Sequence, residues 1–461
     1  MSERVVAIVG GGITGLAAAW ELSAQPGVRV VVLEASDRFG GKIRTSPFAG
    51  LPAVDEGPDA FLARVPEATA LCRELGLGDE LVSPSSGKAW LWWHRRLHAL
   101  PAGLVLGVPS DLRGLARSRL LSVRGKLRAA VEPILPGLAD AVAADNLGAL
   151  VRARFGAEVL ERLVDPLVGG INAGDADDLS ARSSAPQILD VAAGSRSLLV
   201  GLRRRAAGVP DGPVFLVPRS GMGSVVERLV AALAERGVEL RTGAAVDAIE
   251  RAGAGWRVAD VEVDAVIVTT PAFVAARQLA GASADAARLL GAIPHASVAM
   301  VTLAYRDEHV GRPLDGSGHL VPKPEQRALT ACSWASTKWS HWKAPGQSVL
   351  RASLGRHGNE AAADGTDDEL VARAVGDLHE PLRLAGDPIA SRVTRWPAAF
   401  PQHTPGHLER VATIEAALRR DAPGVWAVGA AHRGVGIPAC IRQGRAAARD
   451  ALACLADTLR A

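Results

Sequence analysis

The chain opens with apolar blocks separated by glycines, a pattern that predicts a strand, a tight turn and a helix. Val5 to Val9 form a short apolar run, and Leu16 to Leu22 continue the chain after the glycines. A second apolar run, Val28 to Leu33, follows. Short apolar runs bounded by turn residues are typical of buried strands. The order strand, helix, strand predicts a parallel βαβ unit.

The turn of this unit reads G-G-G-I-T-G from Gly10 to Gly15. Gly10, Gly12 and Gly15 fill the glycine places of G-x-G-x-x-G, which permit a tight turn, close approach to a pyrophosphate and close helix packing. Glu34 ends the second run at a distance suited to accepting hydrogen bonds from a ribose. We therefore predict a dinucleotide site, the alternative being a βαβ unit that binds no nucleotide.

A second glycine pair follows in the segment D-R-F-G-G-K-I-R-T, residues 37–45. Gly40 and Gly41 would let the backbone pass close to a ligand, and Lys42 would supply a positive charge for a diphosphate. The alternative is a glycine turn on a basic surface. The next loop, D-E-G-P-D-A-F-L at 55–62, has a geometry fixed by Gly57-Pro58. It could lie against a flat ring or simply connect two elements.

The region from Trp90 to about residue 128 mixes aromatic, cationic and apolar residues. Its apolar stretch is too short to span a bilayer. The spacing of the cations is compatible with one broad helical face. Three uses remain open: a solvated surface, a helix on a membrane surface, and the rim of a site for an acidic ligand. The cations are Arg113, Arg117, Arg119, Arg124, Lys126 and Arg128.

Helical periodicity from Asn146 to Leu167 is expected to break at G-G-I-N-A-G-D, residues 169–175. Three glycines in an apolar context indicate backbone that something flat or bulky approaches closely, or else a helix end followed by a turn. Beyond a helix at Ser224 to Arg236, strand-like runs include Ala245 to Glu250 and Val261 to Thr270. These runs would complete the nucleotide-binding sheet, so that domain is expected to be discontinuous.

Runs rich in β-forming residues between 296 and 354 predict a separate sheet, with Trp334, Trp339 and Trp342 forming a hydrophobic binding wall. Near the C-terminus, Val425 to Val428 predict a short strand, followed by a glycine-rich loop and a helix at Arg445 to Leu455. Strand, glycine loop and helix N-terminus again form an anion-binding arrangement. Two such arrangements would suit a long dinucleotide such as FAD.

Composition further restricts the classes of protein to which this chain can belong. The chain has 461 residues, 48% of them hydrophobic and 22% charged, which predicts an ordinary globular protein of two or three domains. The net charge of +3, from 52 basic and 49 acidic residues, provides no field of the kind that nucleic-acid binders use. Cys72, Cys332, Cys440 and Cys454 lack C-x-x-C spacing, which argues against a zinc site and a disulfide framework.

No apolar run reaches the length of a membrane span, and the first strand begins directly after Met1 to Arg4. We therefore expect a cytoplasmic protein, with peripheral membrane contact left open and no nucleic-acid partner. The sequence shows no convincing Ser-His-Asp triad, paired-carboxylate motif or metal-ligand cluster, and no metal is expected.

Six segments occur in the order found in one enzyme family. They read G-G-G-I-T-G-L, E-A-S-D-R-F-G-G-K-I-R-T, E-G-P-D-A-F-L-A-R, L-V-G-G-I-N-A-G-D-A-D-D-L-S, T-A-C-S-W-A-S-T-K-W-S-H-W and A-A-H-R-G-V-G-I-P-A-C-I. Together they resemble the porphyrinogen oxidases of haem synthesis over essentially the whole chain. The likeness is nearest to the soluble bacterial branch, regarded as coproporphyrinogen III oxidases, rather than to the membrane-bound protoporphyrinogen IX enzymes.

This resemblance implies the α/β fold of the flavin amine oxidase superfamily. It has a discontinuous Rossmann-type FAD-binding domain, a β-rich substrate domain and a helical domain often called membrane-binding. The expected boundaries are 1–48, 207–275 and 423–461 for the FAD domain, 49–90, 186–206 and 276–422 for the substrate domain, and 91–185 for the helical domain.

The resemblance also implies site residues, with FAD bound non-covalently. Arg64 matches a residue near a substrate propionate, and Gly170 matches a glycine whose carbonyl faces the reacting carbon. Lys42 replaces the arginine usual in the superfamily, and His432 stands where an aromatic residue is expected. The implied FAD contacts are Gly10, Gly11, Gly12, Ile13, Thr14, Gly15, Glu34, Ala35, Lys42, Gly57, Pro58, Asp59, Ala60, Val246 through its backbone, Trp396, Val435, Gly436 and Ile437.

The implied reaction is a six-electron dehydrogenation of a porphyrinogen in three two-electron steps, with O2 reoxidising the flavin to give hydrogen peroxide. The implied partners are the porphyrinogen, O2 and a ferrochelatase that accepts the product. Three alternatives stay open: a protoporphyrinogen IX oxidase, a flavin amine oxidase, and a GDP-dissociation-inhibitor-like binding protein. Amine oxidases often hold the amine between tyrosines, whereas Tyr305 is the only tyrosine here. Cys440 could bind flavin covalently, although a buried structural cysteine is the preferred interpretation.

Overall fold

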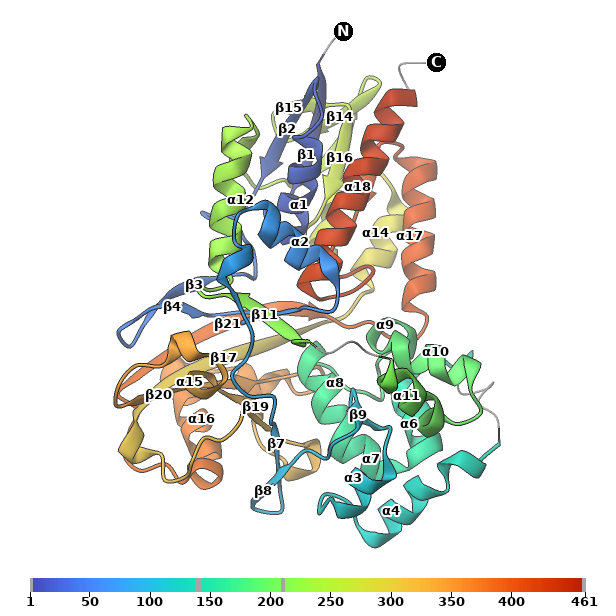
Figure 1. The fold of residues 1–461 in the computed structure, drawn as a ribbon. Coiled ribbons are helices and arrows are strands. Elements are labelled where there is room, and N and C mark those ends of the chain that lie inside the picture. The colour runs from blue at the N-terminus through green and yellow to red at the C-terminus, as the bar shows by residue number, and fades with distance from the viewer. Residues whose placement is uncertain (1–2, 137–142, 209–211, 458–461) are drawn as a thin grey trace.

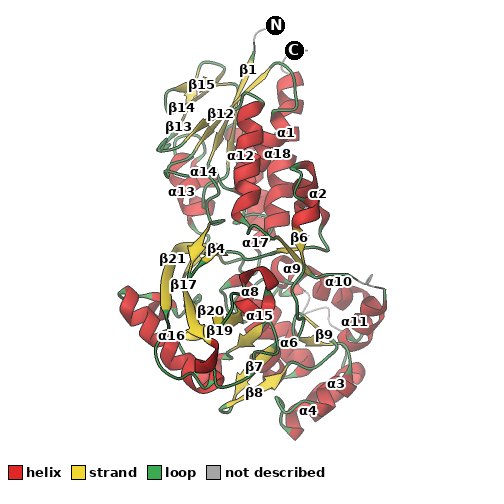
Figure 2. Ribbon diagram, turned by 60° about the vertical axis from the view of Figure 1, so that its left-hand side comes forward, coloured by secondary structure: helices red, strands yellow, loops and turns green. Residues whose placement is uncertain are grey.

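The computed structural model describes residues 3–136, 143–208 and 212–457. Three bodies make up the molecule: one around a parallel sheet, which carries both ends of the described chain, one around a larger mixed sheet, and one built mainly of helices (Figure 1). The parallel-sheet body lies at one end, and the other two lie side by side beneath it (Figures 1 and 2).

The parallel sheet has the strand order β12-β2-β1-β16-β22. Its central strand pairs residue for residue with both neighbours, so that Val6 lies opposite Val30 on one side and Ala265 on the other. The outer strands come from distant parts of the chain, which confirms the predicted discontinuous α/β domain. The strands are β1 (Arg4–Val9), β2 (Val28–Leu33), β12 (Glu239–Arg241), β16 (Ala265–Val268) and β22 (Val425–Ala427).

Alternate residues of β1 point to opposite faces of the sheet, as the pleat requires. Val6 and Ile8 pack in a core with α1, α12 and α18, whereas Ala7 and Val9 pack on the other face. Figure 2 shows the sheet between these two layers. The first layer comprises α1 (Ile13–Leu22), α12 (Gly223–Glu235) and α18 (Ile437–Asp457); the second comprises β13 (Ile249–Ala252), β14 (Gly255–Val258), β15 (Val261–Val263), α13 (Ala272–Gln278), α14 (Ala284–Gly291) and α17 (His407–Asp421).

Three boundaries in this body differ from the prediction. The run Val261 to Thr270 is not one strand, because Asp264 ends β15 and accepts a 2.8 Å hydrogen bond from the Val5 N–H. Only the end of the run Ala245 to Glu250 is extended, as the start of β13. The last helix begins at Ile437, well before the predicted Arg445, since Pro438 is tolerated in a first helical turn.

The mixed sheet has the order β21-β17-β20-β19-β18-β7-β8, and α16 packs on one of its faces. The predicted separate sheet is thus present, but the predicted tryptophan wall is wrong. Trp334, Trp339 and Trp342 are fully buried and belong to the core. The elements are β7 (Trp90–Trp93), β8 (Arg96–Ala99), β17 (His295–Arg306), β18 (Gly318–Leu320), β19 (Leu329–Trp334), α15 (Ala335–Lys338), β20 (Gln347–Leu354), α16 (Asp367–Leu382) and β21 (Ala390–Pro401).

The helical body has its own core, which includes Leu150, Phe155, Leu163, Ile188 and Leu202. A buried ion pair between Arg154 and Glu132 lies in this body. Helices from the segment 186–206 pack in the same core as α6. The helices are α3 (Leu112–Arg117), α4 (Val123–Ala130), α6 (Leu147–Phe155), α7 (Ala157–Val159), a π-helical turn (Leu160–Val164), α8 (Asp165–Asn172), α9 (Ala181–Ser184), α10 (Pro186–Gly194) and α11 (Leu198–Ala207).

Two expectations for this body are corrected. The cations from 113 to 128 do not share one helix, because α3 ends at Arg117 and α4 begins at Val123. Helix α8 does not break at Gly169 but continues to Asn172, and it ends where Ala173 adopts a left-handed conformation. Short strands and one helix link the bodies: β3 (Thr45–Phe48), β4 (Leu51–Asp55), β5 (Phe61–Leu62), α2 (Pro66–Glu74), β6 (Leu81–Val82), β9 (Leu104–Val105), β10 (Val108–Pro109) and β11 (Phe215–Pro218).

Candidate functional site

The first glycine loop connects β1 to α1, and each of its three motif glycines has a different steric role. Gly10 has φ +105°, a left-handed conformation that favours glycine. A methyl group at Gly15 would overlap the carbonyl oxygen of Gly10, so this glycine lets α1 start close to the strand. A methyl group at Gly12 would meet nothing within 4 Å. The open side of the loop is therefore at Gly12, where α1 begins and its N–H groups can receive an anion.

Glu34 lies at the end of β2, beside this loop. Its Oε2 accepts a 2.7 Å hydrogen bond from the Gly11 N–H, and its Oε1 accepts from the N–H and hydroxyl of Ser36. Ala35 is exposed next to it. The carboxylate is thus fixed at the edge of the glycine loop, the position from which it could also accept from a ribose hydroxyl.

The second glycine pair lies directly against the first loop. The Gly40 N–H donates to the Gly11 carbonyl at 2.8 Å, and Gly41 approaches the Cα atom of Gly12. Arg38 holds this second loop by donating to the carbonyl oxygens of Phe39, Gly41 and Ile43. We did not predict this role for Arg38, although its place in the basic glycine segment was a signal.

Lys42 follows the glycine pair. Its surroundings are deep in the protein, and this burial lowers the pKa of the ammonium, yet the side chain itself keeps exposed surface. Both observations fit a residue that lines an internal space. Gly57 packs against the backbone of Lys42, because a methyl group at Gly57 would overlap the Lys42 carbonyl oxygen. Trp396 closes the same side, and its Nε1 donates to the Glu56 carbonyl at 3.1 Å.

The loop Gly57 to Ala60 is held from behind by the mixed sheet. The Arg351 guanidinium donates to the Gly57 carbonyl at 2.6 Å. Asp59 accepts from Lys338 Nζ at 2.8 Å and from Trp339 Nε1 at 3.1 Å. Burial opposes ionisation of Asp59, but the charges of Lys338 and Arg351 outweigh it and lower the pKa of the carboxyl. Asp59 therefore anchors the loop, and Pro58 and Ala60 are half-buried beside it.

The C-terminal loop meets the first glycine loop from the other side. Gly429 has φ +135°, and a methyl group there would lie 3.7 Å from Thr14 Oγ1. A methyl group at Gly444 on α18 would overlap the Thr14 carbonyl oxygen, so α18 and α1 are in close contact. This packing brings Val435, Gly436 and Ile437 to the same end of the parallel sheet as Gly10 to Gly15.

Two further cofactor candidates are Val246 and Thr269. Val246 is buried, and its carbonyl oxygen accepts from Gln278 Nε2 at 2.9 Å. The Thr269 hydroxyl donates toward the Gly10 and Val9 carbonyls, which fixes the β1 end of the loop. Thr269 was not predicted, although it lies in the T-T-P sequence that closes β16.

We call the place where these segments meet the candidate cofactor cleft. Its residues fit FAD: an open glycine turn for the pyrophosphate, a carboxylate for the ribose, a lysine for negative charge, and a glycine-lined loop with a tryptophan on one side. The residue at the expected departure, His432, does not face solvent. Its side chain is buried, and its carbonyl oxygen accepts a 2.8 Å hydrogen bond from His407 Nε2. Cys440 is buried near Thr14 and Lys42, and burial raises the pKa of its thiol.

The substrate candidates lie on separate elements. Arg64 follows β5 and is exposed, with no acidic partner among the described residues. Gly170 lies near the end of α8, where it is exposed together with Ile171, whose exposed fraction is 56%. A methyl group at Gly170 would have only Leu320 nearby, at 3.8 Å. This face of α8 is therefore open to a bulky apolar ligand.

Ion pairs fix α8 beside the mixed sheet. Asp165, in the first turn of α8, accepts from the Arg356 guanidinium at 2.9 Å and from Lys323 Nζ at 3.0 Å, and its side chain is almost fully buried. Arg356 also donates to the Gly174 carbonyl at 2.9 Å. The start of α8 and the turn after it are therefore held by one arginine. We did not predict these partners, because nothing in their local sequence marks them.

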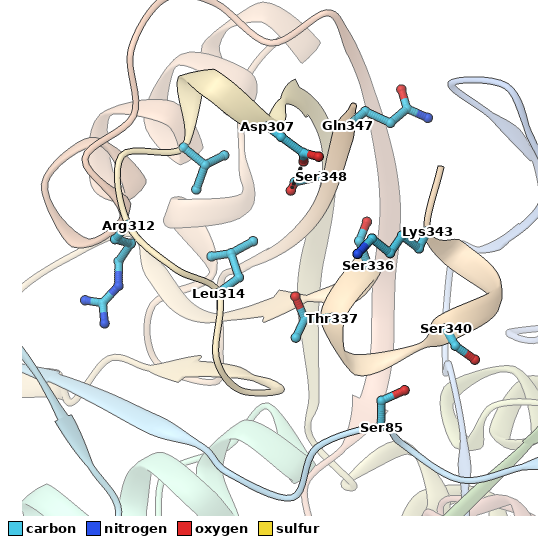
Figure 3. A pocket seen from close by; sticks show the side chains of 11 residues that line it. Ser85, Asp307, Arg312, Leu314, Ser336, Thr337, Ser340, Lys343, Gln347 and Ser348 are labelled. Atoms are coloured by element: carbon cyan, nitrogen blue, oxygen red, sulfur yellow. Dashed lines mark hydrogen bonds between the residues drawn. The ribbon is translucent and has the colours of Figure 1, made fainter. Parts of the chain in front are cut away.

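A cavity of about 490 Å³ lies elsewhere, beyond the end of β17 (Figure 3). Asp307 and Ser348 are hydrogen-bonded on one side of it, and Thr337 and Lys343 lie on the other. The opposite end of β17 begins at His295, whose pKa is lowered by burial, an effect to which the Lys42 charge adds. None of the predicted cofactor or substrate residues lines this cavity, so it is separate from the cleft.

Two further observations bear on the alternatives. Tyr305 is fully buried in the core of the mixed sheet, where it cannot hold an amine. Across residues 3–136, 143–208 and 212–457, no group of three His, Cys, Asp or Glu side chains is arranged to hold a metal ion, and no helix combines the length and apolar character that a bilayer crossing needs.

The proteins that this chain resembles are consistent with a flavin-binding site. Residues 13–452 match the family model described as flavin containing amine oxidoreductase. The chain is 34% identical to the coproporphyrinogen III oxidase of Bacillus subtilis strain 168, covering 98% of each chain. It is 32% identical to the coproporphyrinogen III oxidase of Staphylococcus aureus, covering 98% of this chain and 99% of that one.

A solved structure from Exiguobacterium sp. 255-15, provisionally assigned as a protoporphyrinogen oxidase, superposes with a TM-score of 0.87 at 31% identity. It covers 98% of this chain and 99% of the other. The chain therefore belongs to the flavin-containing amine oxidoreductases and, within them, to the coproporphyrinogen III oxidase family.

Proposed function

We propose that this protein oxidises coproporphyrinogen III to coproporphyrin III in haem synthesis. The balanced reaction consumes three molecules of O2 for each macrocycle and releases three molecules of hydrogen peroxide. The six electrons and six protons that leave the porphyrinogen are all taken up by the oxygen. The observation that carries the proposal is the full-length identity of 34% to the Bacillus subtilis coproporphyrinogen III oxidase, together with a cleft that fits FAD. When bound, FAD would supply the two-electron acceptor that no side chain of this cleft provides.

The role of the chain is to bind, orient and exclude water. Glu34 would bind the ribose, the N–H groups after Gly12 would face the pyrophosphate, and Lys42 would balance its charge. Loop 57–60, Val246, Trp396 and the loop 435–437 would enclose the rest of the cofactor. Binding is expected to be non-covalent, because the raised pKa of the Cys440 thiol disfavours the thiolate that covalent attachment needs.

The macrocycle would lie against the exposed end of α8, with the Gly170 carbonyl facing the reacting carbon. Arg64 is exposed and has no acidic partner within the described parts of the chain, so its guanidinium can pair with a propionate. The substrate is an apolar ring with charged edges. The open face at Gly170 and Ile171 suits the ring, and the exposed guanidinium of Arg64, on a separate element, suits a charged edge. The domain boundaries given above stay predictions, although the helices of 186–206 pack in the core of the helical body and α14 and α17 pack against the parallel sheet.

The test is aerobic turnover of the purified yellow protein with coproporphyrinogen III and protoporphyrinogen IX, followed by porphyrin fluorescence. We expect a higher kcat/KM for coproporphyrinogen III and three peroxides per porphyrin. A clear preference for protoporphyrinogen IX would overturn the substrate assignment. Turnover of simple amines instead would indicate an amine oxidase, and a colourless protein that takes up no FAD would indicate a binding protein.

Helix α4 and the turn that follows it (Glu132–Ile134) carry exposed apolar side chains that support peripheral membrane contact. Val123, Leu127 and Ile134 are 74%, 63% and 75% exposed, and Arg113 and Arg124 are exposed nearby. An apolar stripe flanked by cations suits a surface of anionic lipid. Vesicles containing an anionic phospholipid should retain the wild-type protein but not L127D, and equal retention would contradict this contact.

The coproporphyrin that this protein releases would pass to a ferrochelatase as the next enzyme.

A further inference from the structure

Two stacked histidines contact the loop between β22 and α18, residues 428–436, which we call the C-terminal cofactor loop. His403 precedes α17, and His407 is its first residue. Their ring centroids are 3.9 Å apart and their planes are inclined by only 11°. His403 Nε2 lies 3.1 Å from the carbonyl oxygen of Ala430, and His407 Nε2 lies 2.8 Å from that of His432. Both rings thus contact the backbone that leads from β22 to Val435.

The partners fix where the protons are. A carbonyl oxygen can only accept a hydrogen bond, so Nε2 of each ring must carry the hydrogen. In a neutral ring Nδ1 then has no hydrogen, and His407 Nδ1 is buried without a partner among the described residues. Protonating that nitrogen would place an unpaired charge in the interior. The geometry therefore requires the neutral form of His407.

The surroundings favour the neutral form of both rings. His403 and His407 are buried, and this burial lowers the pKa of each imidazole, to about 3 for His403. His432 and His295 lie within electrostatic range of His403. At His407, burial is the largest effect on the pKa. Its hydrogen bond to the His432 carbonyl and the charge of Asp145 favour protonation, and Arg410 and Arg433 oppose it. At His432, burial again lowers the pKa, to about 4, and Glu415 favours protonation more than Arg433 opposes it.

The other side of the same loop is held by α18. Gln443 Oε1 accepts a 3.0 Å hydrogen bond from the Arg433 N–H, and Gln443 Nε2 donates to the Gly434 carbonyl at 3.4 Å. The loop is thus held between α18 and the histidine pair. Loss of the histidine bonds would free only one side of the loop, which leaves the rest of the parallel-sheet body in place.

We propose that His403 and His407 are positioning residues that hold the C-terminal cofactor loop through neutral imidazole N–H donors, so that the protein releases FAD when these rings become protonated. This rests on the proposed FAD site but not on the proposed substrate. In the released loop the rings are exposed and titrate near pH 6.5, whereas in the closed loop they stay neutral. Acid therefore favours the released form, and affinity falls as the pH drops below about 6.5.

The test measures FAD dissociation from the holoprotein between pH 8 and pH 5 by recovery of flavin fluorescence, with circular dichroism reporting the fold. For the wild type we expect the dissociation constant to be constant above pH 7 and to rise below pH 6.5, by up to about tenfold per pH unit for each histidine. Unchanged affinity down to pH 5 would overturn the proposal.

Variants separate the donor from the charge. Glutamine keeps an N–H donor but cannot be protonated, so H407Q should retain FAD at pH 8 and show a shallower loss in acid, and the double variant H403Q/H407Q should show almost none. H407F lacks the donor and should bind FAD at least about tenfold more weakly already at pH 8. H379Q, on the exposed side of α16, is the matched control and should behave as the wild type.

The outcomes distinguish this proposal from the proposed function. Full acid sensitivity in H403Q/H407Q would overturn the role of the histidines while leaving FAD binding and turnover untouched. A wild-type protein that binds no FAD at any pH would overturn both. If H407F fails to fold, the wild-type pH profile and the glutamine variants still decide the question.

Discussion

The candidate cofactor cleft and the surroundings of α8 are held in place in different ways. The cleft is built mainly from backbone: glycines 10, 15, 40 and 57 occupy places where a side chain would clash or strain the chain. Helix α8 is held by side chains instead, through Asp165, Arg356 and Lys323, which lie far apart in the sequence. A backbone site tolerates almost no added volume, whereas an ion-pair site is sensitive to loss of charge.

The largest effect is expected at Gly15. G15V would force a side chain into the Gly10 carbonyl oxygen and push α1 away from β1, at a cost on the order of 3 kcal/mol or more. Flavin content and urea denaturation of the purified protein measure both consequences. The matched control is G12A, because a methyl group there has open space and Gly12 has an ordinary φ of −72°. It should keep the wild-type stability but bind FAD more weakly, and normal FAD binding by G15V would contradict the comparison.

The next effect is expected at Arg356. R356Q leaves the buried Asp165 carboxylate with Lys323 as its remaining cation, and breaking a buried pair in this way costs about 3 kcal/mol. Urea denaturation should show this loss, and kcat should fall, while the FAD dissociation constant stays within about twofold. The double variant R356Q/D165N should recover part of the stability. Equal loss of FAD affinity would mean that the two regions are not independent.

The third prediction concerns Asp55, a buried carboxyl close to the cofactor loops, and tests whether a charged side chain also affects stability in the region that is held mainly by backbone contacts. It accepts from the Met222 N–H at 2.9 Å and from the Thr45 hydroxyl, and burial raises the pKa of its carboxyl to about 6. The folded protein therefore holds this proton more tightly than the unfolded chain, so stability falls as the pH rises from about 4 to 6. D55N should remove this slope and be more stable at pH 8 by on the order of 2 kcal/mol relative to its difference at pH 4. Parallel stability curves for the two proteins would contradict the assignment.

The smallest effect is expected at Glu34. E34Q keeps an oxygen that accepts from the Gly11 N–H but loses the charge that strengthens a bond to a ribose. The FAD dissociation constant should rise about fivefold to tenfold, near 1 kcal/mol, with unchanged stability. E239Q, which removes an ion pair with Arg29 on the neighbouring strand, is the control and should leave FAD binding unchanged.

The difference between the two regions also explains what could be predicted from the sequence. The loops at Gly10 to Gly15 and Gly40 to Lys42, and the C-terminal glycine loop, could be predicted because turns and close approaches demand particular residue types at fixed spacing. Their contacts with FAD, and that of Glu34, stay predictions. The discontinuous α/β fold followed from the same segments. The match to known coproporphyrinogen III oxidases agrees with the family suggested by these motifs.

The rest depends on distant contacts. Asp264 splits one apolar run into two strands only because it accepts from the Val5 N–H. Trp334, Trp339 and Trp342 looked suitable for a binding wall, but hydrophobicity alone does not distinguish a wall from a core. Arg356, His403 and His407 contact residues that are remote in sequence or carry no motif. The positions of Arg64 and Gly170 relative to a substrate stay predictions.

The close contact of α18 with α1 has a consequence for synthesis of the protein. Gly444 faces the Thr14 carbonyl oxygen, and β22 completes the sheet that β1 begins, so the first and last segments of the chain share one layer. Such long-range pairing cannot form until both segments have left the ribosome. During translation, the glycine turn near the N-terminus must therefore wait for nearly the whole chain, and its apolar strand is exposed to chaperones and to aggregation until the last helix emerges.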